Sequence, residues 1–332
     1  VTGVQTCALP IFTLTLAGGT SGNGLVTANQ ASLVAGTSSS LNTTVNSVVA
    51  NVTGNAQSLA IYQTGRDLTV ASGNVRTNNG SLTLDVATPN NLTVLGNVRV
   101  GSGTVTLNAA GGAVNASTGQ ISAATLNVAA NSTSTLNTAV GTLNANIGGS
   151  GSTLTVIEAD DLTIGAGDVR TNNGLITITT QTGGNLVRTG NISAGTANVI
   201  LNLAGGTSGN GLVTANQVAL TSVGSASLNT TVNSVVASVT GSSQPLAIYQ
   251  IGRDLTVTSS NVRTNNGALT LDVAAPNNLT VLGNVTAGNA TVTLNAGGAV
   301  NVSTGQIMAN TLNVTAGRTS TLNTVEIGRA HV

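Results

Sequence analysis

The sequence predicts an all-β fold, a right-handed single-stranded parallel β-helix (β-solenoid) of about 13 coils with roughly 23 residues in each coil. Three observations lead to this prediction. Short segments alternate apolar residues with Thr, clusters of Gly, Asn and Ser separate them, and the segments fall into nested repeats. No helical periodicity accompanies these patterns, and 42 of the 332 residues are Gly.

The expected strands follow an apolar–Thr–apolar motif, in which the alternation directs apolar side chains inward and Thr outward. The steps from the motif at Leu68 to that at Leu92, and from the motif at Leu82 to that at Val105, set the expected coil length. The motif occurs at 68–70, 82–84, 92–94, 105–107, 154–156, 162–164, 176–178, 255–257, 269–271, 279–281 and 292–294.

Longer repeats organise the strands. LAGGTSGNGLVTANQ occurs at 16–30 and again at 203–217, and DLTVASGNVRTNNG at 67–80 resembles DLTIGAGDVRTNNG at 161–174. The first pair is separated by 187 residues and the second by 94, which is about half as many. Four coils of about 23 residues would account for the shorter separation. A β-sandwich also uses many short alternating strands, but a nested period favours a solenoid, in which each coil stacks on its neighbours.

The two ends read as foreign sequence. VTGVQTCALPI at 1–11 and the final residues 326–332 resemble translated sequencing adapter, so we expect the β-helix domain to span 12–325. The single Cys, Cys7, and the single His, His331, lie in these end segments. The expected domain therefore has no thiol, imidazole or disulfide.

Composition excludes several classes of function. Charged residues make up 5% of the chain, the formal net charge is zero and all nine basic residues are Arg. Such a chain lacks the basic patch of a nucleic-acid-binding protein. No apolar run reaches the length of about 18 residues that a membrane-spanning helix needs. We therefore expect no nucleic-acid partner and no membrane span in this segment.

RTNNG occurs three times and is the candidate recognition motif. If the copies were spaced by four coils, they would lie on one face about 19 Å apart, at about 4.8 Å per coil. The alternative is turn chemistry, because Asn and Gly tolerate positive φ. The residues of this possible recognition row are Arg76, Asn78, Asn79, Arg170, Asn172, Asn173, Arg263, Asn265 and Asn266.

Acidic residues are sparse. Glu158, Asp160 and Asp161 form the densest group, which calcium could accept, but the equivalent segments at 63–67 and 250–254 carry Arg in place of Asp160. Many polysaccharide-cleaving β-helices use paired carboxylates, and no such pair with a basic neighbour emerges from the sequence. We expect no catalytic residue, no metal and no cofactor.

Three further motifs indicate a family. AGG occurs at 17–19, 110–112 and 204–206, STGQI at 117–121 and 303–307, and LNT-x-V at 41–45, 136–140 and 228–232. With the apolar–Thr–apolar coils, they resemble the repeat region of filamentous-haemagglutinin-type bacterial adhesins, over essentially all of 12–325. In that family a β-helical stalk, exported by two-partner or autotransporter routes, holds adhesive parts away from the cell.

The resemblance implies a structural stalk of a secreted or surface-anchored adhesin, located outside the bacterial cell, without catalysis. The expected partners are host or neighbouring-cell surfaces, through glycans or proteins. A polysaccharide-binding or polysaccharide-cleaving module is the alternative. We also expect the isolated fragment to associate end to end, because the exposed edges of terminal coils can pair with another chain.

Overall fold

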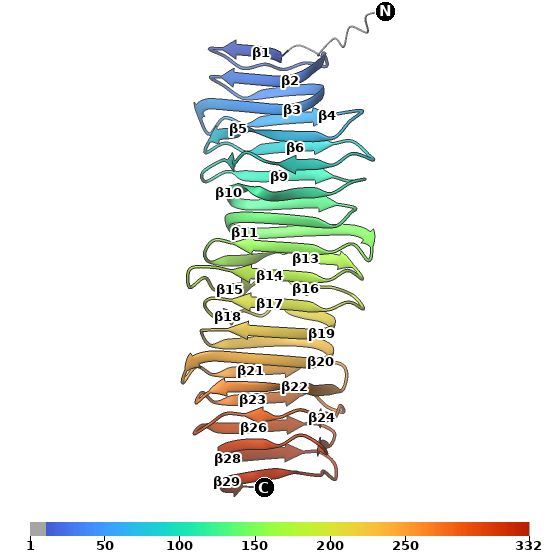
Figure 1. Ribbon diagram of the computed structural model, residues 1–332, viewed down its shortest axis with the longest axis vertical. Helices are drawn as coiled ribbons and strands as arrows, with labels where there is room; N and C mark the ends of the chain where they lie inside the picture. Colours follow the sequence, from blue (N-terminus) through green and yellow to red (C-terminus); the bar gives the residue numbers. More distant parts are fainter. Residues whose placement is uncertain (1–10, 332) are drawn as a thin grey trace, which may run out of the picture. The chain divides into compact units, whose positions relative to one another are not determined.

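The computed structural model describes residues 11–331 and divides the chain into two compact units, 1–152 and 153–332. Across the described residues the chain forms strands and turns and no helix. Each strand pairs in parallel with a strand of the next coil, so each unit is a β-solenoid (Figure 1). The prediction of an all-β parallel solenoid is confirmed. Of the two end segments, residues 1–10 and 332 lie outside the described part.

Unit 1 contains the strands β1 to β11. Their bounds are β1 Ile11–Leu16, β2 Leu25–Ala35, β3 Ser39–Asn55, β4 Leu59–Gln63, β5 Leu68–Asn78, β6 Leu82–Val86, β7 Leu92–Val94, β8 Val98–Arg99, β9 Thr104–Ala109, β10 Val114–Ala130 and β11 Ser134–Ser150.

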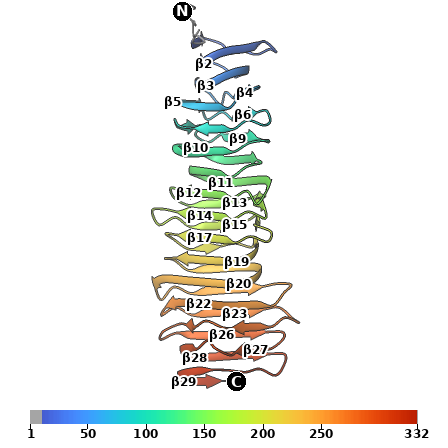
Figure 2. The same ribbon diagram turned by 45° about the vertical axis from the view of Figure 1, so that its right-hand side comes forward.

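Unit 2 holds the remaining strands, and Figure 2 shows its rungs from a second direction. Their bounds are β12 Leu154–Glu158, β13 Leu162–Asn172, β14 Ile176–Thr180, β15 Leu186–Arg188, β16 Ile192–Ser193, β17 Val199–Leu203, β18 Thr207–Ser208, β19 Leu212–Ser222, β20 Ala226–Ser242, β21 Leu246–Gln250, β22 Leu255–Asn265, β23 Leu269–Val273, β24 Leu279–Val281, β25 Val285–Thr286, β26 Thr291–Ala296, β27 Val300–Val302, β28 Ile307–Ala316 and β29 Thr324–His331.

The core consists of columns in which each apolar side chain lies on its equivalent in the next coil. In unit 1, Leu59 pairs with Leu82, which pairs with Val105, and all three are at most 1% exposed. The residues between the inward positions of each strand face outward and are partly or fully exposed. Burying one such apolar side chain contributes about 1.5–3 kcal/mol. The alternation read from the sequence therefore corresponds to the inside and outside of the solenoid.

The coils differ in length and are more numerous than expected, since the two units together hold about 15. Asp85 and Asn108, partners in adjacent coils, have a sequence separation of 23, which matches the expectation. The separation is only 17 between Asn29 and Asn46, and also between Asn216 and Asn233 in unit 2. Long, nearly continuous strands such as β3 and β20 need fewer turn residues, which shortens their coils.

In unit 2 the longer and shorter strands exchange sides at β20. Before β20, one side carries the longer strands β14 and β17, and the other carries the short strands β15 and β18. The first half of β20 pairs with β18 and with β21, so the longer strands β21, β23 and β26 continue the side of β15 and β18. The second half of β20 pairs with β19 and β22, and the short strand β25 continues the side of β14 and β17. One repeat is therefore not a whole number of coils.

Substitution of Leu271 by Ala tests the stacked core. Leu271 is fully buried between Ile248 and Leu294, so the variant should lose about 2–5 kcal/mol of unfolding free energy. Chemical denaturation followed by circular dichroism measures the loss. The outward neighbour Thr270 is the matched control, and its Ala variant should change stability by about 0.5 kcal/mol or less. Equal effects of the two substitutions would contradict the assignment of inward and outward positions.

Candidate functional site

The RTNNG motifs are turns whose polar side chains bind the backbone of adjacent coils. In the third copy, Thr264 is buried and its hydroxyl donates to the carbonyl of Gly267. Asn266 has a φ of 59°, and its Oδ1 accepts the N–H of Asn289 in the next coil at 3.0 Å. A side chain on Gly267 would meet the carbonyl oxygen of Gln244 at 1.9 Å. Glycine is therefore required by close backbone approach.

The same arrangement occurs in the other two copies. Asn79 and Asn173 have φ values of 60° and 61°, and their Oδ1 atoms accept the N–H groups of Ser102 and Thr196. Asn78 donates to the carbonyl of Thr53 at 3.3 Å. In the third copy Asn265 likewise donates to the carbonyl of Thr240, at 3.1 Å. These contacts join coil to coil, which accounts for the repetition of the motif without a ligand.

The arginines of the motif are exposed on the outer surface. Nε of Arg76 donates to Oδ1 of Asn51 at 2.9 Å, and Nε of Arg263 donates to Oγ of Ser238 at 3.0 Å. Arg170 is exposed in β13, beside Ser193 of the next coil. A binding role for these arginines and the adjacent Asn172 stays a prediction.

The expectation that the motifs share one face is wrong within unit 2. Arg170 pairs with Ser193, which pairs with Thr214, which pairs with Thr231. Thr231 directly follows Thr230, which pairs with Gln250. The column of Arg170 therefore reaches the next coil beside Gln250. Arg263 lies slightly more than half-way along the coil that runs from Gln250 to its partner Val273.

Arg263 thus lies about half a coil away from the column of Arg170. The physical reason is that three successive steps are shorter than 23 residues: 21 from Ser193 to Thr214, 17 from Thr214 to Thr231 and 20 from Thr230 to Gln250. Because of these short coils, the repeat does not close after four coils.

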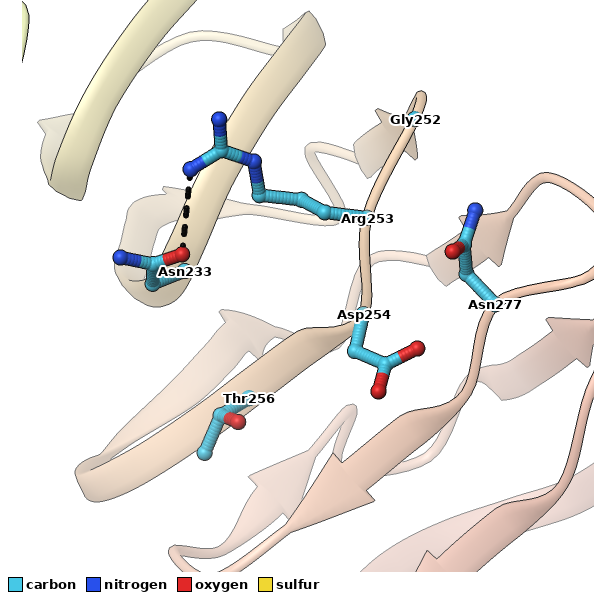
Figure 3. Close-up of a pocket in the computed structure, with 6 residues that line it drawn as sticks. All are labelled: Asn233, Gly252, Arg253, Asp254, Thr256 and Asn277. Carbon is cyan, nitrogen blue, oxygen red and sulfur yellow. Dashed lines mark hydrogen bonds between the residues drawn. The ribbon is translucent and has the colours of Figure 1, made fainter.

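The same polar pocket occurs in both units, at equivalent positions of the longer repeat. In unit 2 its volume is about 540 Å³, and in unit 1 about 510 Å³. Figure 3 shows the unit 2 pocket, with Arg253 directed toward Asn233 and Asp254 directed away from it. The lining residues are Asn46, Gly65, Arg66, Asp67, Thr69 and Asn90 in unit 1, and Asn233, Gly252, Arg253, Asp254, Thr256 and Asn277 in unit 2.

The pocket arginine continues a ladder of asparagine amides along the corner of the coils. In unit 2, Asn216 donates to Asn198 at 3.3 Å and Asn233 donates to Asn216 at 3.0 Å. Nη1 of Arg253 then donates to Oδ1 of Asn233 at 3.1 Å. Arg66 makes the same contact with Asn46 in unit 1, at 2.9 Å. Each guanidinium keeps Nε and Nη2 without a protein partner among the described residues.

The pocket aspartate is fixed by the following coil. Oδ1 of Asp254 accepts the backbone N–H of Asn278 at 2.8 Å, and Asp67 accepts that of Asn91 at the same distance. Gly252 at the pocket rim has a φ of +81°, a conformation that glycine adopts without strain. Each pocket thus holds one cation, one anion, two amides and one hydroxyl, arranged by backbone contacts on either side.

Each of the two tyrosines of the chain lies at an outward position of the strand that precedes a pocket, Tyr62 in β4 and Tyr249 in β21. Tyr62 and Tyr249 are 41% and 40% exposed, in contrast to the buried apolar residues beside them. In the next coil Tyr62 pairs with Asp85, and Tyr249 pairs with Asp272. Asp85 accepts a hydrogen bond from Asn108 at 2.8 Å. Only the structure reveals that each tyrosine is exposed and lies beside a carboxylate of the next coil.

Arg188 is the largest fully buried side chain of the described residues. It occupies an inward position of β15 that Val94 and Val281 hold in the equivalent strands. Its guanidinium donates to the carbonyl oxygens of Gly211 and Ser227, and also to Gly209 and Thr207. Burial lowers the pKa of Arg188 from its ordinary value to about 10, so the side chain is charged at neutral pH.

Sequence reasoning missed Arg188, although one signal was present. In Leu186-Val187-Arg188 the third position breaks the apolar–x–apolar pattern of the equivalent strands at 92–94 and 279–281. The loop that accepts the guanidinium, at 207–211, bends at Gly209 with a φ of +102°, close to the backbone of Arg188. Hydrogen bonds to backbone carbonyls therefore offset part of the cost of burying this charge.

The side chains of the acidic group at 158–161 lie in different environments. Glu158 is fully buried, and its Oε1 accepts the N–H of Ala159 at 2.9 Å, whereas Asp160 and Asp161 are exposed. Among the described residues no group of three His, Cys, Asp or Glu side chains could hold a metal ion.

A candidate membrane-spanning helix is likewise not found in the part of the chain that the structure describes.

Comparisons with known proteins give no further assignment. No family model, no curated protein and no solved structure matches this chain.

Replacement of Arg188 by Val tests its structural role. The variant should lose about 2 kcal/mol or more of unfolding free energy, because the carbonyls of Gly211 and Ser227 lose their buried donor. Denaturation followed by circular dichroism measures this. The exposed Arg99 of β8 is the matched control, and Arg99→Val should shift stability by about 0.5 kcal/mol or less. A higher unfolding free energy for Arg188→Val than for the wild type would show that the buried cation destabilises the core.

The coil-to-coil bonds of Asp161 predict a pH dependence. The N–H of Asn185, followed by its side-chain amide, lowers the pKa of Asp161 below its ordinary 3.8, against a smaller opposing effect of burial. A carboxyl with a lowered pKa stabilises the fold above its ordinary pKa and ceases to do so as the pH falls through the lowered value. The stability difference between wild type and Asp161→Asn should therefore shrink below about pH 4. Denaturation at several pH values measures it, and a constant difference would contradict the assignment.

Proposed function

We propose that this chain is a structural stalk segment of a secreted or surface-anchored bacterial adhesin, without catalytic activity. The observation that supports this most is the open-ended stacking of coils. Within each unit, successive coils share columns of buried residues and the same parallel backbone pairing. Coils of this kind can be added without redesign of the core, which suits a spacer of variable length.

The resemblance of the coils to filamentous-haemagglutinin-type repeats supports the adhesin part of the proposal. AGG, STGQI and LNT-x-V carry that resemblance, and it implies export by a two-partner or autotransporter route. The stalk would then lie outside the cell and present its outer surface to host or neighbouring cells.

Polysaccharide cleavage is less well supported than a stalk. Glycoside hydrolysis uses two carboxylates, about 5–10 Å apart, on either side of the bond. The lining of each polar pocket contains a single carboxylate, Asp67 or Asp254, and that group is held by the amide of the following coil. Polysaccharide binding does not need a second carboxylate and is the stronger of the two alternatives.

Combined substitution of Arg76, Arg170 and Arg263 by Ala tests whether the stalk itself recognises a surface through RTNNG. A passive stalk predicts unchanged adhesion by bacteria that display the protein, because these side chains then serve only the fold and its solvation. Adhesion counts on cultured cells provide the readout, and circular dichroism verifies the fold. Loss of adhesion by a folded variant would assign recognition to the three arginines.

A further inference from the structure

We propose that the polar pocket of each unit, with the tyrosine that precedes it, binds a neutral oligosaccharide. The inference goes beyond the stalk function and does not depend on it. It concerns Arg66, Asp67 and Tyr62 in unit 1 and their counterparts Arg253, Asp254 and Tyr249 in unit 2.

The first argument is that these outward residues change together between repeats. In the second repeat, Ile157 stands in place of Tyr62, Thr179 in place of Asp85 and Asp160 in place of Arg66, while Gly141 replaces Asn46. The inward residues at the start and centre of the same strands stay apolar and buried. The coils therefore fold without the tyrosine, the arginine and their partners. Packing alone does not account for the presence of all four in the first and third repeats.

The second argument is that the pocket contains hydrogen-bond donors and acceptors that are not bound by the protein itself. The arginine donates from Nη1 to the asparagine ladder, and its Nε and Nη2 have no partner among the described residues. The aspartate Oδ1 is anchored by a backbone N–H, and Oδ2 receives only a 3.3 Å contact from the neighbouring amide. One sugar hydroxyl can accept from the guanidinium while another hydroxyl of the oligosaccharide donates to the carboxylate.

The third argument concerns charge and shape. One cation and one anion line each pocket, and the carboxylate beside each tyrosine adds a second anion, so the site has no excess positive charge with which to attract an acidic ligand. Thr69 and the two asparagines add short polar groups, and no large apolar side chain lines the pocket. The exposed ring of Tyr62 lies in the strand that leads into the pocket and offers a flat apolar surface, with a hydroxyl at its tip, to the C–H face of a sugar ring. These features fit a neutral saccharide of more than one ring.

Tyrosine emission gives a direct test, because the chain contains no Trp and its two tyrosines are Tyr62 and Tyr249. The purified chain would be titrated with hexasaccharides of β-1,4-glucose, α-1,4-glucose and β-1,4-N-acetylglucosamine, and with hexagalacturonate as the acidic comparison. Calorimetry of the same mixtures gives the number of sites. We expect at least one neutral hexasaccharide to change the tyrosine emission and to bind at two sites per chain.

Variants assign the binding to the pocket. Arg66→Ala should remove one of the two sites, and the double variant Arg66→Ala, Arg253→Ala should weaken binding by about tenfold or more. The matched control is Arg99→Ala, Arg318→Ala, which removes one exposed arginine from each unit, outside both pockets and outside the RTNNG motifs. The control should retain two sites, and circular dichroism should show the wild-type fold for every variant.

Three results would overturn the proposal. The first is that none of the three neutral hexasaccharides binds the folded wild-type chain. The second is that binding persists unchanged in the double variant of Arg66 and Arg253, or is lost only in the control variant. The third is that hexagalacturonate alone binds, which would show that the ligand is acidic. The stalk proposal would stand in each case.

Discussion

The parallel backbone pairing between successive coils is the constraint on which the rest of the structure depends. It places every paired residue directly beside its equivalent one coil away, so a side chain must be compatible with its own neighbours in a column. Inside, this requirement is met by apolar residues of similar size, such as Leu59, Leu82 and Val105. A single coil buries too little surface to fold alone, and stacking supplies the missing contacts.

The same constraint governs the polar positions. Asparagines at a corner donate to one another from coil to coil, as Asn216 and Asn233 do. Aspartates before a strand accept the N–H of the next coil. Arg188 is a cation in an otherwise apolar column, and it is accommodated where the carbonyls of Gly209 and Gly211 accept hydrogen bonds from its guanidinium. At this position the buried charge depends on a locally adapted coil.

The candidate site could be predicted from the sequence only in part. RTNNG is conspicuous because it repeats, yet its asparagines and glycine serve the turn, as the left-handed Asn79 and Asn266 demonstrate. The polar pockets draw on residues that lie far apart in the sequence, and such residues meet only because coils stack. A comparison of outward positions between repeats could have found Tyr62 and Arg66, since both lose their chemical character in the second repeat while the inward residues at the start and centre of the same strands stay apolar.

The sequence by itself determined the strands, their inward and outward faces and the repeats, because alternation and turn residues act over a few positions. Only the tertiary structure decided the number of coils and the side on which each motif lies. The coil that joins β2 to β3 is shorter than the coil that joins β4 to β6, depending on where the chain bends around the core. These differences accumulate along the chain. They amount to about half a coil between Arg170 and Arg263. This offset depends on the lengths of all the intervening coils, so it cannot be predicted from the sequence near either residue.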